Sequence, residues 1–176
     1  MWSVLRATDN RVFWFCHKGL RCRLLDRLLP LLTHLGSAGA TIAVTLATLF
    51  AGLLSGREAV WRAGISVAIA LAASHLVVHV VKHRVNRPRP RFVLHGTRFF
   101  DVPTCPYSFP SGHTNAAFVV AMAMYPHLPL IGLPLLILAA VIGFSRVYLG
   151  VHYASDVAGG GLIGVTFGLL AGWVGW

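Results

Sequence analysis

Three short polar strings in this sequence carry side chains that could bind an anion or attack it. In the first string, Lys82 is followed after six residues by Arg89 and Pro90. A lysine supplies a compact positive charge and an arginine a planar fork of donors, which together suit the oxygens of a phosphate group. Basic clusters beside apolar segments also bind lipid headgroups, so this string alone leaves both interpretations open.

The second string, Pro110-Ser111-Gly112-His113, has the pattern of a helix start. Ser111 suits the N-cap position, and the unpaired backbone N–H groups at such a helix end attract anions. Gly112 would let the backbone approach a phosphate closely, and His113 would stand where it could donate a proton to a leaving oxygen. A plain capped helix with a histidine at the membrane interface would carry the same four residues.

The third string contains Ser145 and Arg146, then His152 after five intervening residues, and Asp156 four positions after the histidine. A carboxylate at this spacing can accept a hydrogen bond from one imidazole nitrogen, which fixes the tautomer and makes the other nitrogen more nucleophilic. The chain has only five acidic residues, and one that lies beside an apolar span needs a partner or a function. The string therefore predicts a nucleophilic histidine oriented by a carboxylate.

The composition limits where these strings can lie. Of the 176 residues, 56% are hydrophobic and 11% charged, which is too apolar for an ordinary soluble fold. The formal net charge of +10 predicts an anionic partner, either lipid headgroups or an anionic substrate, and no nucleic-acid-binding module is present. The three cysteines cannot form a complete disulfide framework. We expect a single domain, residues 1–176, that crosses a cell membrane several times.

Apolar runs separated by Pro, Gly and basic residues predict an all-α, integral membrane bundle of five to six helices. Residues 1–27 have the pattern of an interfacial amphipathic helix, and residues 28–176 would form the bundle core. Because successive spans alternate in direction, the second and fourth spans end where the third and fifth begin, so the three strings converge on one side of the membrane. The predicted spans are residues 28–54, 61–81, 111–125, 131–149, and 155 to the C-terminus.

Three groups of residues in these helices predict how they pack. Small residues at 36–40 would let a neighbour approach the first span closely. A flat face on the last helix is formed by glycines at every fourth position: Gly160, Gly164, Gly168 and Gly172. The N-terminal helix would direct five apolar side chains toward the acyl boundary: Trp2, Val4, Phe13, Trp14 and Phe15.

Taken together, the three strings resemble the signature of the type 2 phosphatidic acid phosphatase family. That signature is Lys-x6-Arg-Pro, Pro-Ser-Gly-His and Ser-Arg-x5-His-x3-Asp, and this chain matches it in the same order without a mismatch. The resemblance implies a membrane lipid phosphatase that works through a phosphohistidine, with a lipid phosphate as its substrate and with no metal or other cofactor.

The resemblance also implies a role for each matching side chain. His152 would attack phosphorus, and Asp156 would orient His152. His113 would protonate the leaving group and then activate water. Stabilisation of the charge that spreads over the transferred phosphate should be the largest catalytic contribution. The oxygens would be held by Lys82, Arg89, Ser111, Gly112 and Arg146.

Several residues lie outside these motifs. His75, His79 and His83 recur on one face of the second span, where they could hold a metal ion. We prefer the interpretation in which His75 and His79 hydrogen-bond inside the bundle and His83 faces the headgroups. The loop 92–109 could be a lid in which Arg98 meets a distal phosphate, or a simple surface loop. Four further histidines have no motif around them and receive no role: His17, His34, His95 and His127.

The residues that bind phosphate do not identify the lipid. Undecaprenyl diphosphate is our first expectation, by resemblance alone, and phosphatidylglycerophosphate and phosphatidate are the alternatives. A non-catalytic membrane scaffold would not need the complete set of His113, His152 and Asp156. A vanadate-dependent haloperoxidase, whose anion cradle is similar, would be expected to be soluble.

The oligomeric state and the orientation in the membrane also stay open. Of the 15 Lys and Arg residues, all but Arg57 and Arg62 fall on the side of the predicted site. The positive-inside rule would then place the site in the cytoplasm. Recycling of an undecaprenyl carrier would instead require a site outside it, and charges kept for the substrate weaken the rule here.

Overall fold

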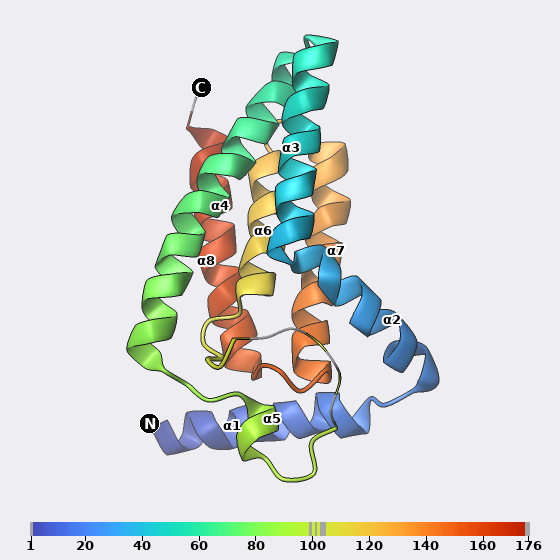
Figure 1. Ribbon diagram of the computed structural model, residues 1–176, viewed down its shortest axis with the longest axis vertical. Helices are drawn as coiled ribbons and strands as arrows, with labels where there is room; N and C mark the ends of the chain where they lie inside the picture. The colour runs from blue at the N-terminus through green and yellow to red at the C-terminus, as the bar shows by residue number, and fades with distance from the viewer. Residues whose placement is uncertain (1, 99, 101, 103–104, 175–176) are drawn as a thin grey trace.

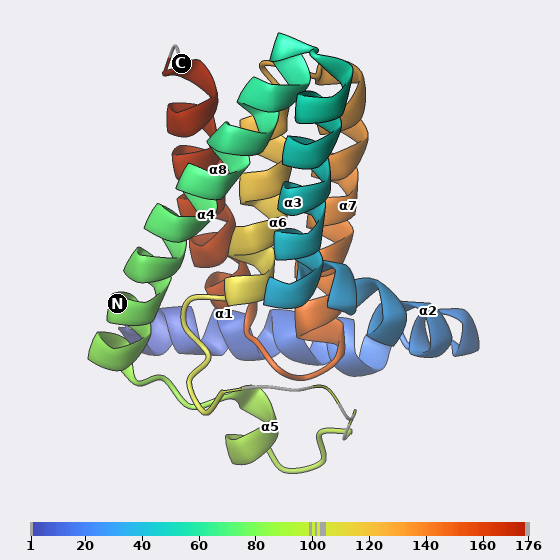
Figure 2. The same ribbon diagram turned by 45° about the horizontal axis from the view of Figure 1, so that its top comes forward.

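The computed structural model describes residues 2–98, 100, 102 and 105–174, with the side chains of residues 2–5 left out of the description. Over these residues every regular element is a helix. The bundle helices stand side by side, and α1 crosses beneath their lower ends (Figures 1 and 2); they are α3, α4, α6, α7 and α8. The elements are α1 (Trp2–Trp14), η1 (Phe15–Gly19), α2 (Arg23–Thr33), η2 (His34–Gly36), α3 (Ala38–Ser55), α4 (Glu58–Val85), α5 (Pro90–Val93), α6 (Gly112–Met124), α7 (Pro129–Tyr148) and α8 (Ala154–Trp173).

Four described helices, α3, α4, α7 and α8, are long and apolar enough to cross a membrane. The predicted third span corresponds to α6, which has only 13 residues. At a rise of 1.5 Å per residue it is about 20 Å long, shorter than the roughly 30 Å of a hydrocarbon core. It packs against α3, α4, α7 and α8, so its neighbours enclose it. The all-α membrane bundle is thus confirmed, with a short helix at its centre.

The predicted first span, residues 28–54, is wrong at its start. The apolar run is divided into α2, the short η2 and α3, and α3 begins only at Ala38. Ser37 has an extended backbone conformation, and its hydroxyl oxygen accepts a hydrogen bond from the Ala40 N–H at 3.3 Å, as an N-cap residue does. Pro30 inside α2 also lacks the N–H that would continue a helical ladder.

The N-terminal helix packs more deeply against the bundle than the amphipathic pattern predicts. Phe13, expected to face the acyl boundary, is fully buried against Val147 and Tyr153. Phe15 is 62% exposed, in line with a contact outside the protein. The predicted contacts of Trp2 and Val4 lie outside the described side chains.

The glycine face of α8 lies against α6, as its spacing predicts. All four glycines are buried. A Cβ added at Gly160 would lie 2.4 Å from the Ser111 carbonyl oxygen, and one at Gly164 would lie 2.5 Å from the Asn115 carbonyl oxygen. These contacts are with backbone, which cannot move aside as a side chain can. In the 36–40 segment Gly36 makes a similarly close contact, whereas a Cβ at Gly39 would meet nothing within 4 Å.

The change Gly164→Ala should therefore destabilise the protein, because the new methyl group would overlap the α6 backbone. Forcing a methyl group into a packed interior lowers the free energy of unfolding by about 1–3 kcal/mol. Thermal unfolding of the detergent-purified protein would measure this loss. Gly161→Ala is the matched control, since its Cβ would lie 3.6 Å from the Phe118 ring, an ordinary contact. Equal stability of the two variants would contradict the close packing.

Candidate active site

The three polar strings meet at one end of the bundle, next to α1 (Figures 1 and 2). The first runs from the last turn of α4 to the first residue of α5, the second opens α6, and the third runs from the end of α7 to the first turn of α8. The Ser111 N–H donates to the carbonyl oxygen of Asp156 at 2.9 Å, and Arg89 donates to that of Val151 at 2.8 Å. These bonds tie the second and first strings to the third, which confirms the predicted convergence.

His152 lies in the loop between α7 and α8 and is 1% exposed. Its Nε2 lies 2.9 Å from a terminal nitrogen of Arg89. Because a guanidinium can only donate, Nε2 must direct its lone pair at Arg89, and the neutral ring carries its proton on Nδ1. Nε2 is therefore the nitrogen with a lone pair available for attack.

Asp156 is fully buried in the first turn of α8. Its Oδ2 accepts a hydrogen bond from the Tyr153 N–H at 2.8 Å and lies 3.5 Å from Nδ1 of His152. That second distance is longer than a formed hydrogen bond, and Nδ1 has no other hydrogen-bond partner in the described chain. Ligand-free sites often hold such pairs slightly apart. The carboxylate thus faces the protonated nitrogen, as predicted for an orienting group.

The environment of His152 keeps its ring neutral. Burial lowers the pKa of His152 well below its ordinary value, and the positive charges of Arg89, Arg146 and Lys82 lower it further. At neutral pH the imidazole is therefore uncharged and its lone pair is not protonated, which a nucleophile requires.

Lys82 and Arg89 come together at the thiol of Cys105. The Lys82 Nζ and a terminal nitrogen of Arg89 each lie 3.3 Å from its Sγ. Burial alone would raise the pKa of this thiol, but the charges and hydrogen bonds of Lys82 and Arg89 outweigh that effect and lower it. The spot where the two predicted phosphate-binding cations meet therefore favours negative charge.

The start of α6 differs in one respect from the prediction. Ser111 occupies the N-cap position, but its hydroxyl makes no capping bond. Instead the hydroxyl oxygen accepts a hydrogen bond from Thr114 Oγ1 at 2.9 Å, and its own proton stays available. At Gly112 a Cβ would meet only Val78, at 4.0 Å, so the backbone there is open to a ligand.

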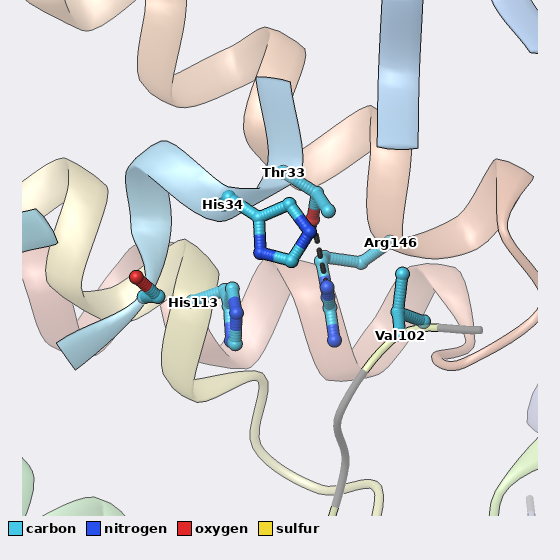
Figure 3. Close-up of a pocket in the computed structure, with 6 residues that line it drawn as sticks. Thr33, His34, Val102, His113 and Arg146 are labelled. Carbon is cyan, nitrogen blue, oxygen red and sulfur yellow. Dashed lines mark hydrogen bonds between the residues drawn. The ribbon is translucent and has the colours of Figure 1, made fainter. Parts of the chain in front are cut away.

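A small hollow of about 100 Å³ lies beside His113 and Arg146 (Figure 3). Arg146 is 1% exposed, and a terminal nitrogen donates to the Thr33 hydroxyl at 2.7 Å. Its Nε has no hydrogen-bond partner within the described part of the chain. A buried guanidinium with an unused donor beside an open space is suited to bind an anion. The hollow is lined by Thr33, His34, Ser37, Val102, His113 and Arg146.

Sequence reasoning missed two residues that support Asp156. Arg87 donates to Asp156 Oδ1 and to Asp9 Oδ2, both at 2.8 Å, while Asp9 Oδ1 accepts a hydrogen bond from the Ser155 N–H at 3.0 Å. Asp9 lies on α1, so the N-terminal helix is linked to the site. Arg87 stands inside the first string, two positions before Arg89, but no local signal identifies Asp9 as its partner.

Two groups lie outside the motifs: the histidines at 75, 79 and 83, a candidate metal site, and the loop 92–109, a candidate contact for a distal phosphate. The ring of His75 hydrogen-bonds the Leu71 carbonyl oxygen at 3.1 Å. Within the described chain, no three His, Cys, Asp or Glu side chains gather closely enough to hold a metal ion. Arg98, which the lid alternative placed against a distal phosphate, donates to both carboxylate oxygens of Asp26, at 2.9 and 3.1 Å. Residues 99, 101, 103 and 104 of the loop lie outside the description.

A buried histidine, a facing carboxylate and several cations at one end of a helical membrane bundle are the groups that a membrane phosphatase with a histidine nucleophile would need. Sequence comparison agrees: the model of the PAP2 superfamily matches residues 63–176, and the chain belongs to that superfamily. The chain is therefore a membrane lipid phosphatase, and a non-catalytic scaffold is set aside.

Two curated relatives come from Bacillus subtilis. Undecaprenyl-diphosphatase BcrC is 31% identical over 147 residues, which are 84% of this chain and 73% of the relative. Phosphatidylglycerophosphatase B is also 31% identical, over 154 residues that cover 80% of this chain and 70% of that protein.

Solved structures show the same fold. A transmembrane PAP2-type phosphatidylglycerolphosphate phosphatase from Bacillus subtilis superposes with a TM-score of 0.80 at 26% identity, covering 96% of this chain and 84% of that one. LpxE from Aquifex aeolicus superposes with a TM-score of 0.77 at 28% identity, covering 92% of each chain.

Proposed function

We propose that this protein is a cell-membrane phosphatase that hydrolyses undecaprenyl diphosphate through a phosphohistidine and without a metal. The observation that carries this proposal is the hydrogen bond that Arg89 donates to Nε2 of His152. The lone pair of the ring therefore lies on Nε2, while Nδ1 faces Asp156. The likeness to undecaprenyl-diphosphatase BcrC supports the choice of lipid.

In the proposed reaction, Nε2 of His152 bonds to the terminal phosphorus while the bond from that phosphorus to the bridging oxygen breaks. The bridging oxygen stays with the lipid monophosphate and takes a proton from His113. Water then attacks the phosphohistidine, gives its proton to His113 and releases inorganic phosphate. Asp156 stabilises the positive charge on His152. The phosphate oxygens are held by Lys82, Arg89, Arg146, the Ser111 hydroxyl and the Gly112 N–H.

An apolar hollow of about 340 Å³ between α3 and α4 supports a lipid substrate. It begins at Ala38, next to Ser37, which lines the hollow beside His113 and Arg146. Its other lining residues include Ile42, Leu46 and Leu71. A prenyl or acyl chain could lie in this hollow while its phosphate reaches the cations, because neighbouring residues at the start of α3, Ser37 and Ala38, line the two spaces.

A second candidate substrate is phosphatidylglycerophosphate. The likeness to phosphatidylglycerophosphatase B and the TM-score of 0.80 to a phosphatase of that kind favour it. The cations that would bind a terminal phosphate are the same in both reactions.

Phosphate release by the detergent-purified protein tests the proposal, with undecaprenyl diphosphate, phosphatidylglycerophosphate and phosphatidate as substrates. We expect the highest kcat/KM for undecaprenyl diphosphate, and no loss of activity on addition of a chelator. Faster cleavage of phosphatidylglycerophosphate would favour the second candidate. Loss of activity with chelator, restored by added metal, would contradict the metal-free mechanism.

A further inference from the structure

His34 lies in the hollow beside His113 and Arg146, although no sequence motif surrounds it. Figure 3 shows its ring alongside the side chains of these two residues. His34 comes from η2, His113 from α6 and Arg146 from α7. A histidine ring has an N–H donor in both its neutral and its charged form. The hollow thus contains a further ring, besides the two predicted side chains, that can donate to an anion.

The backbone on both sides of His34 packs against α6 and α7, the helices that carry His113 and Arg146. Thr33 accepts the hydrogen bond from Arg146 at 2.7 Å. Gly36 lies so close to α6 that a Cβ there would be 2.9 Å from the His113 carbonyl oxygen and 2.8 Å from Ile142. The break between α2 and α3 therefore holds His34 beside the site rather than leaving it at the start of a membrane span.

The roles proposed for His152 and His113 place the hollow on the leaving-group side of the site. In phosphoryl transfer the attacking and leaving atoms are roughly in line on opposite sides of phosphorus. Attack comes from His152, which does not line the hollow, and the proton for the leaving oxygen comes from His113, which does. Arg146, which also lines the hollow, is proposed to hold the transferred phosphate, whereas His34 lies beside His113, the proposed proton donor, within reach of the leaving group.

We propose that His34 binds the phosphate of the leaving group and so selects lipid diphosphates over lipid phosphomonoesters. This inference rests on the proposed function. When a diphosphate is cleaved, the leaving group is a lipid monophosphate with anionic oxygens that can accept the His34 N–H. When a monoester is cleaved, the leaving group is a lipid alcohol, which has no such oxygens. The contact therefore exists for only one of the two substrate classes.

Farnesyl diphosphate and farnesyl monophosphate test this specificity, because they share one tail and differ only in the second phosphate. A hydrogen bond to a charged group contributes about 1.5–3 kcal/mol, or roughly 10- to 100-fold in rate. We expect His34→Ala in the full chain to lower kcat/KM for the diphosphate by roughly that factor and to change the monophosphate value less than about twofold. His34→Gln keeps an N–H donor and should recover part of the loss.

His95→Ala removes a histidine from the loop after α5, outside the site, and should leave both substrates unaffected. Equal losses for both substrates in His34→Ala and His34→Gln, or no loss for either, would overturn the role of His34 while leaving the phosphatase activity in place. A wild-type protein that cleaves only the monophosphate would overturn both this inference and the proposed diphosphatase function.

Discussion

The change His152→Ala should abolish turnover, because it removes the atom proposed to bond to phosphorus. Loss of a catalytic nucleophile typically lowers kcat by at least about 10⁴-fold. The fold should survive, since the histidine lies in the loop between α7 and α8 and its ring contacts mainly other site residues. Release of phosphate from undecaprenyl diphosphate, measured beside a thermal unfolding curve, would separate loss of catalysis from loss of structure.

A trapping experiment with substrate labelled at its terminal phosphate distinguishes the two catalytic histidines. Wild-type protein quenched in alkali, where phosphohistidine survives, should carry the label, and His152→Ala should carry none. His113→Ala keeps the nucleophile but loses the group that activates water, so its label should appear slowly and then persist. Label retained by His152→Ala would show that another residue is the nucleophile.

The change Arg87→Met should weaken both the fold and the reaction, because two buried carboxylates would lose the same partner. Asp156 is fully buried and the Asp9 side chain is 9% exposed, while Arg87 is 22% exposed. Breaking a buried ion pair costs about 3–5 kcal/mol, and the partial exposure of Arg87 points to the lower end. Activity should also fall, by roughly 10- to 100-fold, as when the outer partner of a metal ligand is removed.

A double-mutant cycle with Asp9→Asn tests whether the three side chains form one network. In wild type, Asp9→Asn removes a partner of Arg87 and should destabilise the protein. In the Arg87→Met background the same change removes an unpaired buried charge, so it should cost less or even stabilise. Arg84→Met is the control, because Arg84 is exposed in the last turn of α4. Additive effects of Arg87→Met and Asp9→Asn would contradict the network.

The convergence of the three polar strings could be predicted from the sequence, because each string is local and the alternation of span directions fixes the side to which it belongs. The packing of Gly164 and its three companions against a neighbour was also predictable, because a repeat of four marks one helix face. The first inference needs only the order of the apolar runs and the polar strings, and the second needs only the spacing of the glycines. The neighbour's identity, α6, required the structure.

The break at Ser37 and the pairing of Asp9 with Arg87 could not be predicted in this way. An apolar run predicts one span whether or not an N-cap residue interrupts it. Ser37 is one of five consecutive small residues at 36–40, so nothing marks it as a cap. Asp9 and Arg87 are 78 positions apart, and no local pattern connects them. The role proposed for His34 depends on that same break, which explains why the histidine showed no signal in the sequence.

The short central helix sets an order for biosynthesis. A helix of 13 residues is too short to be held in a bilayer alone, so α6 can settle only once its neighbours enclose it. The neighbour that its backbone touches most closely is α8, which the ribosome makes after α6 and α7. The Ser111–Asp156 hydrogen bond forms at this same contact. The settling of α6 and the completion of the active site are therefore coupled, and we expect no phosphatase activity from a nascent chain that lacks α8.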